Sequence, residues 1–406
     1  MPHDIDMSIY YANYRLWIAT GRHVAGHKEE SMFLYDNWYV AALSDEIDSK
    51  KPLARVICGK PIVFYRTTEG CPVGLEDRCI HRGMPLSDGK VCEHGSGTLQ
   101  CPYHGLEFDA TGACVVAPGQ ATIPRAMRVL SYPVVERDGF VWLWPGDPAL
   151  ASEAAIPVTG CVPEAGWNYF GQTHLEFKAD WQLLLDNLMD MNHIAYVHVA
   201  AINGDPDAHT SAKMTVTTDD ENYRVTVQRH LPNCNPPEQY QFAYNFKGKI
   251  DRWQEFTWAP SGVAFRSGGV DAGTGAFEGR REAGVQLQHF HGITPSVEGE
   301  THYFFIGIRN FALDNAVVGA KMQDGMVTTL IEDREVIEQQ QRRLNETATR
   351  PLVSLASDAG GLAVRRILTR LACAEAARKP ETAMPPVALG ERVVNVDAML
   401  RAGLSR

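Results

Sequence analysis

The sequence predicts an α+β protein with two domains: a small all-β domain, then a larger α+β domain in which helices cover an antiparallel sheet. Three observations support this fold class. Short β-rich runs separated by turn residues occupy the first third of the chain. Beyond them, long helical stretches flank a series of alternating runs, as in an antiparallel sheet with one covered face. The length of 406 residues is sufficient for two separate hydrophobic cores.

The chain divides into four expected segments: an N-terminal extension (1–32), the all-β domain (33–150), the α+β domain (151–380) and a C-terminal tail (381–406). In the all-β domain, strands are expected near residues 37–40, 56–57, 61–65, 73–75, 106–108, 114–116 and 134–144, the last run turning back in a hairpin at 137–139. A Pro- and Ala-rich stretch over 145–155 is expected to link the two domains.

The α+β domain is expected to open with an apolar helix over residues 181–198. Alternating runs then predict antiparallel strands over 214–227, 240–247, 263–270, 285–292 and 301–311. Two further helices are expected over 320–344 and 361–377. Helices before and after a run of strands favour a sheet that is covered on one face.

Composition and charge narrow the class of function. A formal net charge of −11 without a Lys/Arg block disfavours a nucleic-acid partner. No apolar run approaches the ~18 residues of a membrane span, and charges interrupt the N-terminal stretch where a signal peptide would be apolar. Nine scattered cysteines, an odd number, indicate a reducing compartment rather than a disulfide framework. A cytoplasmic protein is therefore expected.

Two short motifs predict an iron–sulfur centre in the all-β domain. The pair Cys79 and His81 is followed, after nineteen residues, by the pair Cys101 and His104. This CxH…CxxH spacing is typical of a Rieske [2Fe–2S] cluster, in which two cysteines bind one iron and two histidines bind the other. A structural Cys₂His₂ zinc site uses the same ligand types, but CxxC…HxxxH is its commoner spacing, so we favour the cluster.

A second metal site is predicted in the apolar helix. Asn187, Asp190 and His193 follow one another at three-residue steps and so lie along one side, where buried polar groups are costly unless something satisfies them. His198 comes five residues after His193, about 140° around an ideal helix. For both histidines to reach one metal, the helix must widen or end between them. The alternative is two core histidines satisfied by backbone carbonyls.

The third ligand is expected to be a carboxylate, because two histidines and one carboxylate leave positions open on iron. The helix over 320–344 offers two adjacent acids. Asp333 falls on an apolar stripe with Leu330 and Ile337, whereas Glu332 falls on the expected exposed face. A carboxylate on the apolar stripe needs a counter-charge, so Asp333 is the expected ligand. An ion pair between Asp333 and an arginine is the alternative.

Together these residues resemble the Rieske non-haem iron oxygenases and, within that family, the vanillate O-demethylase oxygenase components. The resemblance runs from about residue 33 to about residue 378. Its motifs are Asn-Trp-Tyr-Val-Ala at 37–41, the ligand loops at 79–86 and 101–106, the metal-binding stretch at 187–198 and Ser-Asp-Ala-Gly-Gly at 357–361. The gap between the ligand loops is longer than the family pattern, and 93–97 is the expected insertion.

The resemblance implies a catalytic domain of the helix-grip type, with the cluster on Cys79, His81, Cys101 and His104 and with mononuclear Fe(II) on His193, His198 and Asp333. It also implies a homotrimer in which the cluster of one subunit faces the iron of the next. Asp190 is the implied link between His193 and a cluster histidine of the neighbouring subunit. Asn187 is implied to support the iron ligands, so Asp190 and Asn187 are the candidate catalytic residues.

The implied reaction is monooxygenation of the methoxy carbon of a vanillate-like methoxybenzoate. Electrons from NADH pass through a flavin and iron–sulfur reductase to the cluster and then to the iron. With O₂ the methyl group is hydroxylated, and the resulting hemiacetal releases a phenol and formaldehyde. This chain has no Gly-rich strand–turn–helix for nucleotide binding, so the reductase is expected to be a separate polypeptide.

Substrate-binding residues are expected on the strands of the second domain. His289 and His291 share one face of an alternating run, and Arg252 and Arg266 are further candidates for binding an aromatic carboxylate. Surface or sheet-edge positions are the alternative for all four. Two other functions use the same metal-binding residues in whole or in part: a ring-hydroxylating or N-demethylating Rieske oxygenase, and a non-catalytic iron–sulfur electron-transfer protein.

Overall fold

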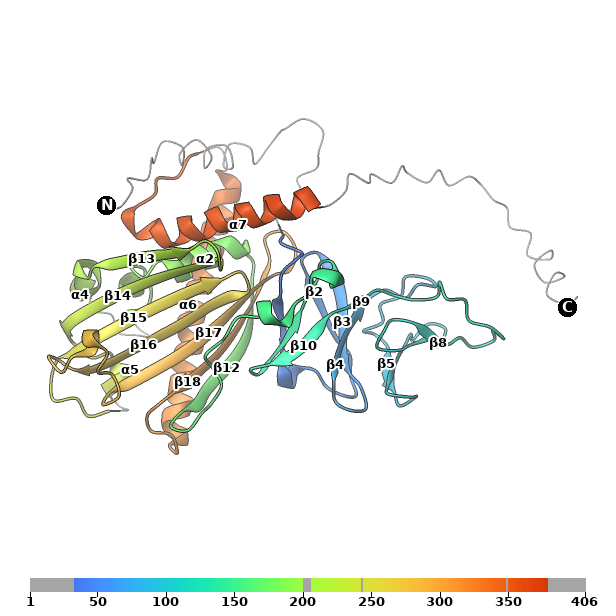
Figure 1. Ribbon diagram of the computed structural model, residues 1–406, viewed down its shortest axis with the longest axis horizontal. Coiled ribbons are helices and arrows are strands. Elements are labelled where there is room, and N and C mark those ends of the chain that lie inside the picture. The colour runs from blue at the N-terminus through green and yellow to red at the C-terminus, as the bar shows by residue number, and fades with distance from the viewer. Residues whose placement is uncertain (1–32, 200–205, 242–243, 348–349, 379–406) are drawn as a thin grey trace, which may run out of the picture.

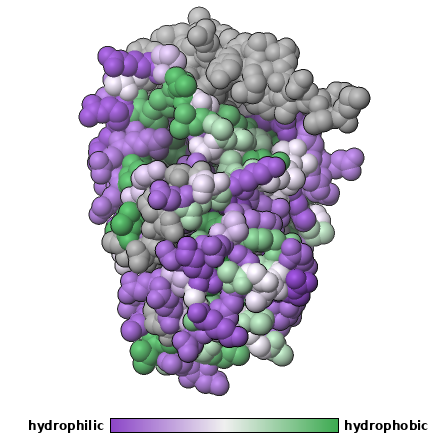
Figure 2. Space-filling model, turned by 90° about the vertical axis from the view of Figure 1, so that its left-hand side faces the viewer, coloured by the Kyte–Doolittle hydropathy of each residue, from purple (hydrophilic) through white to green (hydrophobic). Residues whose placement is uncertain are grey.

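The computed structural model describes residues 33–199, 206–241, 244–347 and 350–378, and within them two domains lie side by side (Figure 1). The expected extension over 1–32 and the tail over 381–406 lie outside the described residues. In the described part of the chain, no helix is both long enough and apolar enough to span a membrane. Hydrophilic side chains dominate the end of the second domain, with small hydrophobic groups scattered among them (Figure 2).

The first domain is built from three small antiparallel sheets, as its short β-rich runs predict. One sheet contains β1 (Tyr39–Leu43), β11 (Phe140–Leu143) and β10 (Val134–Arg137). The second contains β2 (Leu53–Ile57), β3 (Lys60–Arg66), β4 (Pro72–Glu76) and β9 (Ser131–Tyr132). The third contains β5 (Lys90–Cys92), β6 (Thr98–Gln100), β7 (Glu107–Phe108) and β8 (Cys114–Val116), and it carries the two ligand loops.

The second domain is organised around a seven-stranded antiparallel sheet with the order β12-β18-β17-β16-β15-β14-β13. Its strands are β12 (Asn168–Phe177), β13 (Met214–Asp219), β14 (Arg224–Cys234), β15 (Ile250–Ala259), β16 (Gly262–Asp271), β17 (Val285–Pro295) and β18 (Thr301–Arg309). The order of β13 to β18 follows the chain, so neighbouring strands are joined by direct connections. β12 pairs with β18 and closes the other edge.

Helices cover one face of this sheet. They are α2 (Trp181–Met189), α3 (Ile194–Val197), α4 (Pro206–Ser211), α5 (Glu238–Gln241), α6 (Ala316–Glu346) and α7 (Ala359–Arg378). Short 3₁₀ helices are found at Ser44–Glu46, Pro148–Leu150, Glu153–Ala155, Ala276–Glu278 and Ala356–Asp358. The main core lies between sheet and helices, where Val227 and Trp258 meet Leu184, Ile337 and Ile367.

The first domain packs on the opposite face of the sheet, over β17 and β18. Trp38 and Trp142 of the first domain share a core with Phe290 and Phe304 of these strands. The Thr294 hydroxyl also donates to the carbonyl oxygen of Val40 at 2.7 Å. The two domains therefore share a hydrophobic core, which holds them in one arrangement.

Several expected elements in the second domain differ from the observed ones. The single helix over 181–198 is wrong, because the chain leaves the helix at Asp190, whose φ and ψ of −102° and 114° are extended, and begins a new turn at Ile194. The run over 214–227 contains two strands, β13 and the start of β14, rather than one. The strand over 240–247 is also wrong: the described part of this run is helical at its start, and Tyr244 N–H bonds to Tyr240 C=O four residues earlier.

In the second domain, two strands were not expected at all, β12 and β15. Both carry charged and polar residues among their apolar ones, among them His174 and Glu176 in β12 and Asp251 and Arg252 in β15. His174 is partnered at the domain junction, the Asp251 carboxylate accepts the N–H of Asn233 within the second domain, and Arg252 lies beside an internal cavity. Because burial here does not follow apolar character, the alternation that indicates a half-buried strand is obscured.

Candidate active site

The two ligand loops of the first domain have the same backbone design. In each, the N–H of a glycine donates to the C=O of the cysteine four residues earlier, Gly83 to Cys79 at 2.9 Å and Gly105 to Cys101 at 3.1 Å. Each cysteine N–H in turn donates to the C=O of the residue after that glycine, Cys79 to Met84 and Cys101 to Leu106, both at 2.8 Å. Both glycines have a φ of +71°, a conformation that residues with a Cβ rarely adopt. The two loops therefore form matching turns, and each turn carries one cysteine and one histidine.

The ligands divide into a buried pair and an exposed pair. Cys79 and Cys101 are each 1% exposed, whereas His81 and His104 are exposed, with their ring centroids 4.6 Å apart. Burial raises the pKa of the Cys79 thiol, so two adjacent thiolates need a bound cation. The four ligand atoms are not gathered within 4.8 Å of one another, whereas the bond lengths of a single zinc ion place its ligands roughly 3.3–3.8 Å apart. The site therefore fits a two-iron cluster better than one zinc ion.

A second set of ligands meets where α3 and α6 face each other. Potential ligand atoms of His193, His198 and Asp333 lie within 4.8 Å of one another, and both His198 and Asp333 are buried. His193 and His198 flank the single turn of α3, which ends at Val197. The break at Asp190 and this short turn bring together two rings that a continuous helix would hold apart.

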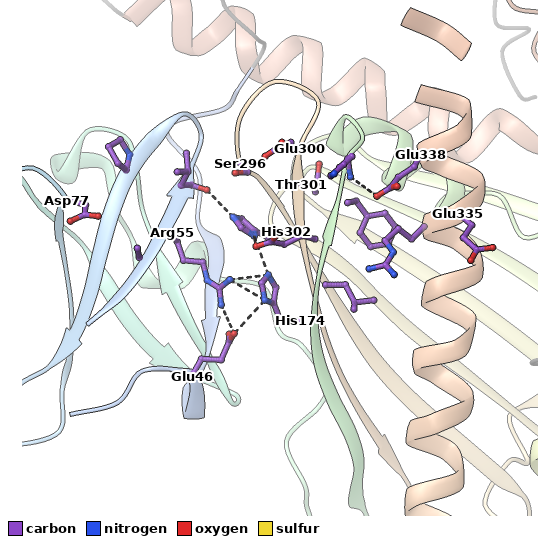
Figure 3. A pocket seen from close by; sticks show the side chains of 18 residues that line it. Glu46, Arg55, Asp77, His174, Ser296, Glu300, Thr301, His302, Glu335 and Glu338 are labelled. Atoms are coloured by element: carbon purple, nitrogen blue, oxygen red, sulfur yellow. Dashed lines mark hydrogen bonds and ion pairs between the residues drawn. The ribbon is translucent and has the colours of Figure 1, made fainter. Parts of the chain in front are cut away.

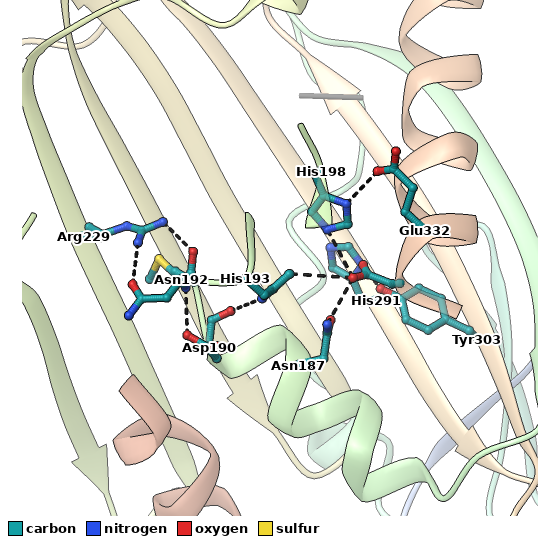
Figure 4. Close-up of polar contacts among 11 residues, drawn as sticks. Asn187, Asp190, Asn192, His193, His198, Arg229, His291, Tyr303 and Glu332 are labelled. Atoms are coloured by element: carbon teal, nitrogen blue, oxygen red, sulfur yellow. Dashed lines mark hydrogen bonds and ion pairs between the residues drawn. The ribbon is translucent and has the colours of Figure 1, made fainter. Parts of the chain in front are cut away.

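The imidazoles of this triad are oriented by their outer nitrogens. Nδ1 of His193 is hydrogen-bonded to the C=O of Asp190. Nδ1 of His198 is hydrogen-bonded to the Glu332 carboxylate at 2.9 Å. Both Nε2 atoms consequently point towards one oxygen of Asp333, at 3.7 Å from His193 and 3.2 Å from His198 (Figure 4). Outer hydrogen bonds of this kind fix the ring orientation and leave Nε2 available as the metal ligand.

The charge of the triad fits a cation. Among the described residues Asp333 makes no ion pair with an arginine, so the alternative role for this carboxylate is not found. Burial lowers the pKa of His193. For His198 burial acts in the same direction, but hydrogen bonds and charges from Asp333 and Glu332 outweigh it and raise its pKa. Two imidazoles and one carboxylate with a cation-favouring environment fit ferrous iron.

Glu332 is placed differently from the sequence expectation. It was expected on an exposed face, but its side chain is 22% exposed and it accepts the hydrogen bond from His198. The apolar stripe of α6 identified Asp333 alone, because Glu332 lies beside that stripe rather than on it. Its position directly before Asp333 was the one available signal.

Asn187 and Asp190 both lie next to the triad. The Asn187 side-chain amide donates to Asp333 Oδ1 at 3.1 Å. Asp190 contacts His193 through its backbone carbonyl, whereas its carboxylate accepts the N–H of Asn192 at 2.8 Å. The expected link from Asp190 to a second subunit involves atoms outside a single chain and stays a prediction.

The triad opens onto a small internal cavity of about 70 Å³. Its apolar walls are Leu188, Phe256, Phe265, Leu287, Met326 and Leu330. Polar side chains in the lining include Arg252, Gln254, Ser267, His289, His291 and Tyr303. Apolar walls with a few convergent polar groups are the lining that small-molecule sites use, although this cavity is smaller than the roughly 300–1,000 Å³ of such sites.

Three buried nitrogens of this cavity have no hydrogen-bond partner among the described residues: Arg252 Nε, His289 Nε2 and His291 Nε2. Burial lowers the pKa of His291 to about 3 and that of His289 well below its ordinary value, so both rings are neutral. His291 Nδ1 is already paired with the Tyr303 hydroxyl at 2.7 Å. Buried unpaired polar groups are costly, so these nitrogens are sites for a ligand to satisfy.

Of the four residues expected to bind substrate, the structure brings three to this cavity. His289 and His291 share a face of β17 as expected, and Arg252 lines the same space from β15. Arg266 is exposed and lines separate hollows with Val158. Phe265 and Ser267, its neighbours in β16, face the cavity, so the period-2 alternation of the strand turns Arg266 to the opposite face.

Two family models match the chain. Residues 37–133 match the Rieske [2Fe–2S] domain, and residues 177–374 match the vanillate O-demethylase oxygenase C-terminal domain. The expected domain limits of 33–150 and 151–380 enclose these ranges and stay predictions.

Among curated relatives, a putative toluene-4-sulfonate monooxygenase iron–sulfur subunit of Comamonas testosteroni is 39% identical over 85% of this chain and 98% of its own. A vanillate O-demethylase oxygenase subunit of a Pseudomonas species (strain HR199 / DSM 7063) is 37% identical over 85% of this chain and 96% of its own.

A crystal structure of dicamba monooxygenase with non-haem iron and dicamba shares the fold, with a TM-score of 0.73 and 32% identity. The match covers 86% of this chain and all of that one. The matched regions contain both ligand loops and the His–His–Asp triad. The chain therefore belongs to the Rieske non-haem iron oxygenases, monooxygenases that carry a [2Fe–2S] cluster and a mononuclear iron.

Proposed function

We propose that the protein is the terminal oxygenase component of an aromatic O-demethylase, which converts a vanillate-like methoxybenzoate into a phenol and formaldehyde. The observation that carries this proposal is a largely apolar cavity with the His–His–Asp triad in its lining and a buried, incompletely paired Arg252 in the same wall. Iron held by the triad supplies O₂ activation. The protein's own residues bind the substrate, orient it and exclude water.

Each part of the cavity has a role in this proposal. Arg252 binds the carboxylate, because a buried guanidinium stabilises an anion strongly. Phe256 and Phe265, stacked with centroids 4.2 Å apart, provide an apolar wall for the aromatic ring. With the Tyr303 hydroxyl donating to Nδ1 of His291, Nε2 of that neutral ring carries a proton and donates to a substrate oxygen. His289 offers its Nε2 in the same way.

We further propose that a head-to-tail homotrimer carries the electron from cluster to iron, with Asp190 linking His193 to His104 or His81 of the partner subunit. The exposed cluster histidines, flanked by exposed Ile80 and Tyr103, favour such a contact. Within one chain the β5–β8 sheet lies on the far side of the first domain from the catalytic sheet (Figure 1). A separate NADH-dependent flavin and iron–sulfur reductase supplies the electrons. The protein acts in the cytoplasm, where cysteines that do not bind the cluster stay reduced.

The test is a substrate panel with a surrogate reductase, NADH and O₂, with formaldehyde and aromatic products both measured. Vanillate-like methoxybenzoates are expected to release formaldehyde in step with NADH consumption. Toluene-4-sulfonate is included because relatives at 38% and 39% identity are named for it. Its methyl hydroxylation gives a benzylic alcohol and no formaldehyde. A panel that yields only that alcohol, ring diols or no turnover would reject O-demethylation.

Two variants test the cavity itself. Arg252→Met is expected to raise KM for a methoxybenzoate by about 10- to 100-fold, because a charge-assisted hydrogen bond of roughly 1.5–3 kcal/mol is lost. Arg266→Met is the control, since Arg266 faces away from the cavity, and its KM is expected to stay within about twofold. Equal effects of the two substitutions would contradict the assignment of Arg252.

A further inference from the structure

Arg229 is a buried cation directly behind the chain break that carries Asp190 and His193. It projects from β14, is 1% exposed and ranks among the largest fully buried side chains described. It lies outside the substrate cavity and binds neither metal centre. The burial of this charged side chain is therefore not explained by substrate binding or by metal binding.

The guanidinium of Arg229 is bonded to the turn between α2 and α3. Nη2 donates to the C=O of Met191 at 2.8 Å, and Nη1 donates to the side-chain oxygen of Asn192 at 3.1 Å (Figure 4). The same group donates to the side-chain oxygen of Gln254 on β15 at 3.0 Å and to the C=O of His209 in α4 at 3.3 Å. One side chain thus ties the break to the sheet and to α4.

Burial of the charged Arg229 side chain is unfavourable for the free energy of folding. In the described part of the chain, the hydrogen bonds of Arg229 all end on neutral acceptors. Burial and the nearby charge of Arg252 lower its pKa to about 10, so it remains charged at neutral pH. A buried charge with no carboxylate among its hydrogen-bond partners is costly, and the nearby charge of Asp190 offsets only part of this cost. Compared with an apolar side chain, Arg229 adds the hydrogen bonds to Met191 and Asn192.

We propose that Arg229 is a positioning residue for electron delivery to the iron. By holding Met191 and Asn192, it keeps the Asn192 N–H on the Asp190 carboxylate and the Asp190 C=O on Nδ1 of His193. It therefore orients, through one turn of backbone, both the carboxylate that links the subunits and the imidazole that binds iron. The inference rests on the proposed function of Asp190.

The test compares Arg229→Met with Arg309→Met. Arg309 is an equally suitable buried arginine, 2% exposed, which donates to the carbonyls of Phe311 and Ala312 at the end of β18. Each holoenzyme variant is reduced, mixed with O₂ and a methoxybenzoate, and followed at the visible absorbance of the cluster. Arg229→Met is expected to keep the cluster and its iron but to slow cluster oxidation at least tenfold. KM is expected to stay within about threefold, because Arg229 does not itself line the cavity and reaches it only through the hydrogen bond to Gln254.

Two further readouts separate positioning from folding. The EPR spectrum of the nitric oxide adduct of the ferrous site is expected to change in Arg229→Met and to remain unchanged in Arg309→Met. Arg229→Lys, which restores a donor to the break, is expected to recover part of the rate and to provide the folded comparison if the methionine variant does not accumulate. The EPR readout needs no turnover, so it stands even if no methoxybenzoate is a substrate.

The inference is overturned if both arginine variants slow cluster oxidation equally, or if Arg229→Met leaves the rate and the spectrum unchanged. It is also overturned if Arg229→Lys has the full defect of the methionine variant while the Arg309 control is active.

Discussion

Asp333 is the residue on which the proposed iron site depends. It is the carboxylate towards which both imidazoles point, and the Asn187 amide donates to it at 3.1 Å. Asp333→Asn replaces the one negative ligand with a neutral amide, so we expect loss of most mononuclear iron, retention of the cluster and loss of turnover. Iron per chain, measured after cluster iron is subtracted, and the visible cluster spectrum check this prediction.

Glu332→Gln provides the matched control, because the substituted side chain lies one residue away and contacts the metal only through His198. We expect iron to bind about 10- to 100-fold more weakly, the usual effect of losing an outer hydrogen-bond partner, yet to be retained at high iron concentration. If the cluster spectrum disappears together with the iron in Asp333→Asn, the two centres are not independent.

At the residue scale, the sequence indicates side chains whose chemistry is local, but it does not indicate the direction in which a side chain points. His193, His198 and Asp333 follow from polar residues in apolar surroundings, and the structure gathers these three. Arg266 was misplaced because adjacent strand positions face opposite sides, and the strand register was not known from the sequence. Arg229 gave no signal, since its partners are mostly backbone and neutral side-chain oxygens from distant segments.

The start of α7 packs against the end of α2, next to the break between α2 and α3. A Cβ built on Gly360 would lie 2.8 Å from the C=O of Met189, the last residue of α2, and 2.6 Å from the Val227 side chain. The glycine therefore allows the helix to approach the end of α2 closely. This contact lies immediately before Asp190, so it supports the same turn that Arg229 holds.

Gly360→Ala is expected to destabilise the protein by about 1–3 kcal/mol, because overpacking forces backbone or side chains to shift. Gly325→Ala is the control within the other long helix. A Cβ there meets nothing within 4 Å, so we expect stabilisation by about 0.4–1 kcal/mol from reduced freedom of the unfolded chain. Urea midpoints of the two variants check this opposite pair of shifts. Similar midpoints would show that the contact with Met189 relaxes freely.

At the element scale, helices α6 and α7 and the strands β16 to β18 could be predicted because their apolar periodicity is regular. The helix over 181–198 was predicted as continuous because its apolar character continues past Met189. No proline or glycine marks a break there, and the local competitor with the helix is the Asp190 carboxylate, which accepts the N–H of Asn192. The break is stabilised by tertiary contacts, those of Arg229 among them, which are not visible from local sequence.

The junction between the two domains contains a chain of neutral histidines (Figure 3). Arg55 of β2 contacts His174 Nδ1 at 3.1 Å, His174 Nε2 contacts His302 Nδ1 at 3.2 Å, and His302 Nε2 donates to the C=O of Val56 at 3.1 Å. Burial and the charge of Arg55 lower the pKa of His174 to about 3 and that of His302 to about 4. Glu46 and Glu176 are the acidic groups that face these rings.

This junction predicts a loss of stability in acid. The unfolded histidines bind protons below their ordinary pKa of 6.5, whereas the folded ones do so only near 4 and 3. Unfolding therefore takes up protons, and the stability present above pH 6.5 falls as the pH decreases towards 4. The double variant His174→Gln/His302→Gln is expected to show a Tm that falls about 2–4 °C less between pH 7 and pH 5. An unchanged slope would mean that the rings titrate normally.

The division of the proposed cluster ligands into buried sulfurs and exposed imidazoles has a consequence for the proposed trimer. If electrons leave one chain at its surface and enter another, two variants that are inactive alone should regain activity when they assemble together. A Cys101→Ser chain keeps a good iron site, and an Asp333→Asn chain keeps a good cluster. In randomly mixed rings about a quarter of the contacts pair the two intact halves, so roughly that share of wild-type activity should return.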